Sequence, residues 1–198
     1  MCHTVIFDIG KVLVDYFPME YLHKLFPGDE DTVRAVWDAI WASGLWTALD
    51  GGADTEETFA RMRELAPGRE DAVDLAFRRS GECLAQYDYA LPWLRELKDR
   101  ALRLLFLSNY SDHTAKSNPE ALSFLPLMDG GIFSWKVKLL KPDPAIYAAL
   151  RDAYSLIPAE CVFLDDRAEN VRAAREYGLN AIQFESYEDA RIKLERFL

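Results

Sequence analysis

The sequence has few cysteines, no excess of basic residues and no long hydrophobic segment, and each shortage excludes a class of protein. Three cysteines occur among 198 residues, and Cys2, Cys83 and Cys161 are odd in number and widely spaced, which fits neither a disulfide framework nor a zinc site. No apolar run approaches the roughly 20 residues that span a bilayer. A formal net charge of -10 argues against a nucleic-acid partner, which usually requires a clustered basic face. We therefore expect a soluble globular protein with neither nucleic acid nor membrane as its partner.

The first residues, MCHTVIFD, lead directly into an expected strand. They lack the basic region, the longer apolar segment and the small-residue cleavage site of a secretory signal. We therefore expect a cytoplasmic location with reduced thiols. The length suits one domain with a sizeable insertion.

The order of apolar runs and turn signals divides the chain into two kinds of structure. A short apolar run predicts a strand at about residues 4–8. Between residues 18 and 88 the pattern is helical, without a convincing strand, and is interrupted by FPGD, LDGGAD and APGRED. Helices are expected to end at Gly44, to cover about 54–66, and to run from about Arg69 to Tyr87. This stretch predicts an all-helical insertion after the first strand.

From Leu91 onward helices and strands alternate, which indicates βαβ units and a parallel sheet. The expected strands are 103–108, a short one near 131–135, 161–165 and 180–184. The expected helices are 91–100, pieces within 111–125, 143–154, 168–177 and a last one from about 187. We predict an α/β fold whose core is formed by residues 1–16 and 89–198, with residues 17–88 inserted as a helical domain.

Chemically useful side chains follow three of the apolar runs. Asp8 follows TVIF, Ser108 follows RLLFL, and Asp165 and Asp166 follow CVFL. The carboxyl ends of strands are where open α/β sheets bind ligands, so these residues are expected to form one site. Lys141, in LLKPDP, precedes an expected helix start. A carboxylate, a hydroxyl, a cation and an acidic pair are the parts needed to move a phosphoryl group.

With these four motifs in this order, the chain resembles the haloacid dehalogenase-like (HAD) hydrolase superfamily along nearly its whole length. That resemblance implies a Rossmann-like core, a cap formed by the helical insertion, and a magnesium-dependent phosphatase of the capped sugar-phosphate type. The expected partner is a small phosphorylated metabolite such as a sugar phosphate, with a homodimer also compatible with the cap surface.

The resemblance also assigns roles to the first three motifs. Asp8 would attack phosphorus and form a transient aspartyl phosphate. Ser108 and the backbone amide of Asn109 would bind phosphoryl oxygens. Lys141 would neutralise charge on both the nucleophile and the phosphate. Each residue alone also has an ordinary structural explanation, such as a strand-end cap, a turn or a solvated lysine.

The fourth motif implies the metal. Adjacent carboxylates repel and commonly need a cation or hydrogen bonds to stay ionised. Mg²⁺ prefers about six oxygen ligands and keeps several waters, so Asp8, the Gly10 carbonyl and Asp166 would bind it directly, with Asp165 acting through water. Asn170 would support the metal or the lysine, or is simply a polar group on a helix surface.

One position departs from the family pattern. Most phosphatases of the superfamily carry an acid-base Asp two residues after the nucleophile, where this chain has Gly10. General acid-base groups contribute typically 10²–10⁴-fold, so the departure favours good leaving groups such as sugar 1-phosphates, or a substitute acid. Asp112 and His113 are the nearest candidates, although a solvated loop pair is the simpler interpretation.

Three alternatives remain open from the sequence. Trp37, Trp41 and Trp46 either contact substrate or form the core of the helical insertion. Gly10 also allows a phosphate-sensing or protein-binding module with negligible turnover. A haloacid dehalogenase is the third alternative, disfavoured because that branch has DxYGT where this chain has DIGKV.

Overall fold

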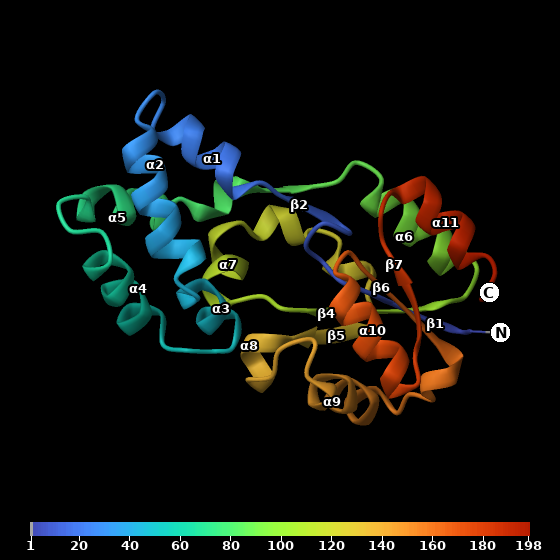
Figure 1. Cartoon of the computed structure of the whole chain (residues 1–198). Helices are drawn as coiled ribbons and strands as arrows, with labels where there is room; N and C mark the ends of the chain where they lie inside the picture. The colour runs from blue at the N-terminus through green and yellow to red at the C-terminus, as the bar shows by residue number, and fades with distance from the viewer. Residues whose placement is uncertain (1) are drawn as a thin grey trace.

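A five-stranded parallel sheet forms the centre of the protein, as seen in a computed structural model that describes residues 2–198 (Figure 1). The strands lie in the order β5-β4-β1-β6-β7. Their bounds are β1 (Thr4–Phe7), β4 (Arg103–Ser108), β5 (Gly130–Phe133), β6 (Cys161–Asp165) and β7 (Asn180–Gln183). β1 is central, because Thr4 aligns with Arg103 on one side and Cys161 on the other. The predicted α/β class and parallel sheet are confirmed.

Alternate residues of β1 enter the two hydrophobic layers of the core. Val5 and Phe7 belong to one layer, which includes residues of α6 (Ala90–Asp99) and α11 (Tyr187–Leu194). Ile6 belongs to the other, which includes residues of α9 (Pro144–Tyr154) and α10 (Ala168–Tyr177). Figure 1 shows these helix pairs on opposite faces of the sheet. Covering both faces explains why the strands are continuous apolar runs.

The inserted segment, residues 17–88 and here called the helical block, lies beyond the carboxyl ends of the strands (Figure 1). Its helices are α1 (Pro18–Leu25), α2 (Glu30–Trp37), α3 (Leu45–Asp50), α4 (Thr55–Glu64) and α5 (Glu70–Arg78). A π-helical turn, Asp38–Ala42, extends α2 almost to Gly44, the predicted end of that helix. Asp54 caps α4 by accepting a hydrogen bond from the Glu57 backbone N–H.

The expectation that residues 18–88 contain no strand is wrong. β3 (Leu84–Gln86) pairs in antiparallel fashion with β2 (Val14–Tyr16) at the base of the helical block. The helix expected to reach Tyr87 therefore ends at Arg78 and gives way to a 3-10 turn, Ser80–Cys83. A three-residue strand is too short to show a period of two in the sequence, which is why the helical pattern masked it.

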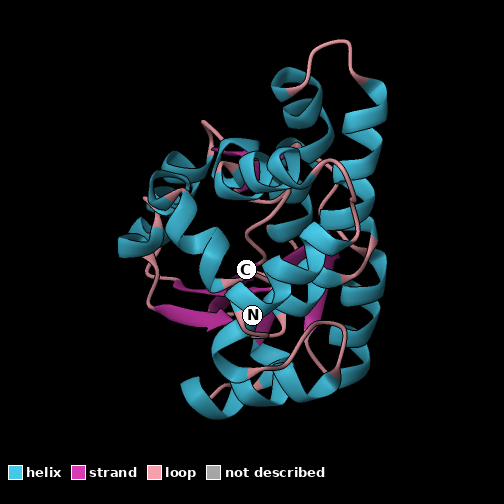
Figure 2. Ribbon diagram, turned by 90° about the vertical axis from the view of Figure 1, so that its left-hand side faces the viewer, coloured by secondary structure: helices cyan, strands magenta, loops and turns pink. Residues whose placement is uncertain are grey.

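The other predicted elements agree with the structure, apart from small differences in length. The region 111–125 holds α7 (Asp112–Ser117) and two 3-10 turns, Pro119–Leu122 and Leu125–Leu127. After β5 the chain forms a short helix, α8 (Ser134–Val137), and a further 3-10 turn, Pro158–Glu160, precedes β6. Figure 2 shows how largely helices enclose the sheet. Across the part of the chain described, no helix combines the length and apolarity needed to cross a membrane.

Candidate active site

Asp8 lies at the carboxyl end of β1, and the residue is only 7% exposed. Its Oδ1 accepts hydrogen bonds from the Ile9 backbone N–H at 2.7 Å and from Ser108 Oγ at 2.7 Å. Lys141 Nζ lies 2.9 Å from the same oxygen, so the expected contact between Lys141 and Asp8 is present. Among residues 2–198, no hydrogen bond engages Asp8 Oδ2. That oxygen is therefore available to a ligand or an electrophile.

Lys141 is buried between two carboxylates. Its Nζ lies 2.7 Å from Asp165 Oδ2 as well as 2.9 Å from Asp8 Oδ1, and its side chain is 1% exposed. Burial alone would lower the pKa of Lys141, but the charges of Asp8 and Asp165 outweigh it and raise the pKa above its ordinary value. The ammonium therefore remains charged at neutral pH.

The loop that carries Lys141 is held in place by Asn109, the residue that follows Ser108. Asn109 Oδ1 accepts from the Lys141 backbone N–H at 2.8 Å, and Asn109 Nδ2 donates to the Lys141 carbonyl at 2.9 Å. This reciprocal pair joins the end of β4 to the lysine loop. Asn109 thus acts on the geometry of Lys141 through its side chain, in addition to the backbone amide role expected of it.

The two adjacent aspartates have different surroundings. Asp165 is fully buried, and both its oxygens accept from Asn170 Nδ2 at 3.0 Å, while Oδ1 also accepts from the Arg167 backbone N–H. Asp166 is only partly buried, and no hydrogen bond or ion pair of its carboxylate occurs within residues 2–198. Asp165 therefore holds Lys141 and the start of α10, whereas Asp166 has free oxygens. Asn170 supports the lysine through Asp165.

The acidic cluster fits a small divalent cation. One carboxylate oxygen from each of Asp8, Asp165 and Asp166 lies within 4.8 Å of the others. Burial, followed by the Asp165 charge, raises the pKa of Asp166, and burial is likewise the main cause that raises the pKa of Asp8 to about 7. A cation would relieve this strain between carboxylates, and their hard oxygens suit Mg²⁺. The role of the Gly10 carbonyl as a ligand stays a prediction.

A cavity of about 600 Å³ is lined by residues of the helical block and by sequence neighbours of this cluster, whereas Asp8, Lys141, Asp165 and Asp166 are not among its lining residues. On the sheet side its lining includes Gly10, Asn109 and Arg167. On the other side Trp37, Trp41 and Trp46 form a stacked row, with ring centroids 5.7 Å and 5.4 Å apart, that also lines the cavity. The tryptophans are therefore both packing partners of one another and walls of the cavity. Tyr16 lines it too, but the preceding residue, Asp15, does not.

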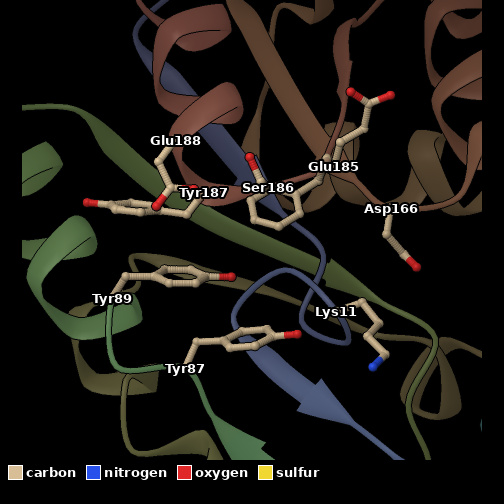
Figure 3. A pocket seen from close by; sticks show the side chains of 9 residues that line it. Lys11, Tyr87, Tyr89, Asp166, Glu185, Ser186, Tyr187 and Glu188 are labelled. Atoms are coloured by element: carbon tan, nitrogen blue, oxygen red, sulfur yellow. The ribbon is translucent and has the colours of Figure 1, made fainter.

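Asp15 instead contacts two residues, Lys11 and Tyr87, that line a second hollow. Its Oδ1 accepts from Lys11 Nζ at 2.7 Å and from Tyr87 Oη at 3.0 Å. Figure 3 shows Lys11 and Asp166 together beside a column of tyrosine rings formed by Tyr87, Tyr89 and Tyr187. Asp166 thus lies on the boundary between this hollow and the acidic cluster.

Asp112 and His113, the nearest sequence candidates for a substitute acid, do not join the cluster around Asp8. Asp112 pairs with Lys116 at 2.6 Å. The His113 ring bonds to Ser80 Oγ and the Phe77 carbonyl and stacks on the Phe77 ring, and burial lowers its pKa. Both residues follow Ser111, which caps α7, and their contacts with Lys116, Ser80 and Phe77 do not include Asp8.

Two residues of the site were missed in the sequence. Asp50, at the end of α3, and Arg167, after β6, both line the cavity. Arg167 directly follows the acidic pair in the sequence, and this proximity to the motif is a signal that could have identified it. Asp50 is 42 residues from Asp8 in sequence, and nothing local marks it as part of the site.

Comparison with known proteins agrees with this geometry. The haloacid dehalogenase-like hydrolase family matches residues 2–178. The chain is 30% identical over 189 residues to Phosphatase MT3486 of Mycobacterium tuberculosis, covering 90% of this chain and 85% of that protein. It is 39% identical over 150 residues to flavin mononucleotide hydrolase 1 of Arabidopsis thaliana, covering 72% of this chain and 57% of the other.

Among solved structures, a HAD family enzyme of Bacteroides thetaiotaomicron, crystallised with magnesium and inorganic phosphate, has the same fold. Its TM-score is 0.72 at 20% identity, covering 96% of this chain and 99% of that one. A parallel sheet with a buried Asp at the carboxyl end of its central strand matches the class of hydrolases that these comparisons name. The chain belongs to the haloacid dehalogenase-like hydrolase family.

Proposed function

We propose that this hydrolase is a magnesium-dependent phosphatase that removes the phosphoryl group from a small phosphomonoester through an aspartyl phosphate on Asp8. The observation that carries the proposal is the state of the Asp8 carboxylate. One oxygen is fixed by Ser108 and Lys141, and the other faces no donor among residues 2–198. Such a carboxylate is a positioned nucleophile with one reactive oxygen.

The chemistry follows from the groups around Asp8. Asp8 Oδ2 attacks phosphorus, the bond to the ester oxygen breaks, and the phosphoryl group is carried on Asp8 until water releases it. The Lys141 ammonium and the Ser108 hydroxyl stabilise the charge on the phosphoryl oxygens. Asp8 and Asp166 would hold Mg²⁺, which when bound neutralises phosphoryl charge. The Mg²⁺ and phosphate bound to the Bacteroides relative support this assignment.

We propose residues 17–88 as the cap that selects the substrate. Tyr16 and the tryptophan row line a cavity whose volume of about 600 Å³ is in the range of small-molecule sites. Aromatic faces beside an acidic cluster suit a polar ring such as a sugar phosphate. The relatives named as a phosphatase and as a flavin mononucleotide hydrolase support phosphate esters as the substrate class.

The test is phosphate release from a panel of sugar 1-phosphates, sugar 6-phosphates and p-nitrophenyl phosphate, with Mg²⁺ or EDTA, by wild type and Asp8→Asn. We expect release that requires Mg²⁺ and falls at least about 10³-fold in the variant, since the nucleophile is lost. Absence of release from every ester by folded, magnesium-binding protein would favour a phosphate-sensing module, for which Gly10 is the specific argument. Halide release from 2-haloacids without metal would identify a dehalogenase.

A further inference from the structure

When the bond between phosphorus and the ester oxygen of an alkyl phosphomonoester breaks, the leaving group departs as an alkoxide unless a proton reaches that oxygen. Gly10 has no side chain to supply that proton. The Lys141 ammonium is committed to two carboxylates at 2.7 and 2.9 Å. A donor for the leaving group must therefore come from elsewhere in the wall of the cavity.

Asp50 is the one carboxyl group that lines the cavity within residues 2–198. The other polar walls are poorer proton donors at neutral pH. Burial raises the pKa of the Tyr16 and Tyr110 phenols above their ordinary values. A carboxyl is the group that can both give and take a proton in this pH range.

The backbone of Asp50 is fixed to the sheet side of the site. Its carbonyl accepts from Ser134 Oγ at 2.6 Å, and the same Ser134 Oγ accepts from the Tyr110 backbone N–H at 2.9 Å. One buried hydroxyl thus ties the end of α3 to the loop after β4. This loop carries Asn109, which holds Lys141.

Gly52, two residues after Asp50, allows this close seating. A Cβ at Gly52 would lie 2.7 Å from the Trp135 carbonyl oxygen, and Gly52 has a φ of +82. A Cβ at Gly51 would lie 3.6 Å from Leu140 Cδ1, next to the catalytic lysine. The turn after α3 is therefore packed against both α8 and the lysine loop. Asp50 is placed by the core, although it belongs to the helical block.

The Asp50 carboxyl is unpartnered within residues 2–198, and its pKa responds to the charge of Asp8. No hydrogen bond or ion pair of this side chain occurs in the described chain, residues 2–198. Burial, followed by the negative charge of Asp8, raises the pKa of Asp50 to about 7. A protonated and an ionised form are thus both accessible near neutrality, as an acid-base group requires.

We propose that Asp50, supplied by the helical block, is the general acid and base that replaces the side chain absent at Gly10. The proposal rests on the proposed phosphatase function. As Asp8 attacks phosphorus and the P–O bond to the leaving group breaks, the Asp50 proton passes to the leaving oxygen and yields the alcohol. The Asp50 carboxylate then takes a proton from the water that attacks the aspartyl phosphate. Inorganic phosphate leaves, Asp8 is regenerated, and Asp50 is protonated again.

The experiment compares two esters in wild type, Asp50→Asn and a control, Glu56→Gln, which removes one exposed negative charge six residues away. The substrates are a sugar 6-phosphate, whose alkoxide needs a proton, and p-nitrophenyl phosphate, whose phenolate leaves without one. In Asp50→Asn we expect kcat/KM for the sugar ester to fall at least about 100-fold. For the aryl ester kcat/KM should stay within about threefold, because its first step needs no acid.

A pre-steady-state measurement tests the role of Asp50 as a general base separately from its role as a general acid. Because water attack still needs the base, the aryl ester should show a burst of one p-nitrophenolate per site in Asp50→Asn, followed by slow turnover. Glu56→Gln should behave as wild type. Equal loss of kcat/KM on both esters, or no loss on the sugar ester, would overturn the role of Asp50. Failure of wild type to hydrolyse even the aryl ester would instead overturn the proposed function, and the Asp50 role with it.

Discussion

The Lys141 ammonium lies 2.7 Å from Asp165 Oδ2, inside the core, while its distance to Oδ1 of the proposed nucleophile, Asp8, is 2.9 Å. The first aspartate of the acidic pair is therefore the partner that holds the lysine. The second, Asp166, has no hydrogen-bond or ion-pair partner for its carboxylate among residues 2–198. The pair divides into a residue that positions the lysine and a residue suited to metal.

This division predicts unequal effects on folding. Asp165→Ala removes a buried carboxylate that receives hydrogen bonds from Lys141, Asn170 and the Arg167 backbone. Breaking a buried ion pair on one side typically costs about 3–5 kcal/mol. We expect a loss of that order in the free energy of unfolding, measured by urea denaturation. Asp166→Ala is the matched control, and an equal or smaller loss for Asp165→Ala would contradict the division.

The environment of Asp166 predicts how the thermal stability of the protein responds to Mg²⁺. Its raised pKa reports an unfavourable negative charge in the metal-free protein, so Asp166→Asn should raise the metal-free melting temperature. A gain on the order of 1 kcal/mol corresponds to about 2–4 °C for a chain of this size. Adding Mg²⁺ should raise the melting temperature of wild type but not of the variant. A Mg²⁺ shift of wild-type size in Asp166→Asn would exclude this residue as a ligand.

Two glycines with the same backbone conformation provide a test of how α3 is seated. Gly44 and Gly52 both have a φ of +82, but only at Gly52 would a Cβ collide with the core. Each Ala substitution should cost roughly 1–2 kcal/mol from the left-handed backbone. Gly52→Ala should lose more, and it should also slow hydrolysis of the sugar ester by displacing Asp50. Differential scanning calorimetry and kinetics of both variants measure this; equal behaviour would contradict the seating.

His113 predicts a pH dependence of stability. Burial lowers its pKa in the folded protein below the value of about 6.5 in the unfolded chain. Between these two values the unfolded chain binds the extra proton, so the contribution of neutral His113 is complete above about pH 6.5 and is lost as pH falls. The stability difference between wild type and His113→Gln should therefore be larger at pH 7.5 than at pH 5.5 in urea titrations. A difference that grows on acidification would contradict this sign.

The parallel sheet and the residues at its strand ends were predictable from the sequence, because each lies at a local transition that the pattern records. TVIF followed by Asp8 and CVFL followed by Asp165 are apolar runs that end in a carboxylate. Parallel strands bring such ends to one edge. The meeting of Asp8, Lys141 and Asp165 follows from that rule together with the family resemblance.

What the sequence did not predict depends on contacts between distant segments. β2 and β3 are each three residues long and are stabilised by pairing with each other, so neither has a periodic signal of its own. Asp50 follows an ordinary helix and precedes two glycines, which read locally as a turn. Its place in the site is decided by Ser134 and by close packing on Trp135, and tertiary contacts of that kind leave no local pattern.

The most direct test of the account is to trap the phosphoryl group on Asp8. Protein turning over a phosphomonoester with Mg²⁺ is quenched in acid, digested and analysed by mass spectrometry, with Asp8→Asn treated in parallel. We predict a phosphorylated peptide that contains Asp8, formed only with Mg²⁺ and absent from the variant. Steady phosphate release without any phosphorylated peptide, or with the phosphoryl group on another residue, would contradict the account.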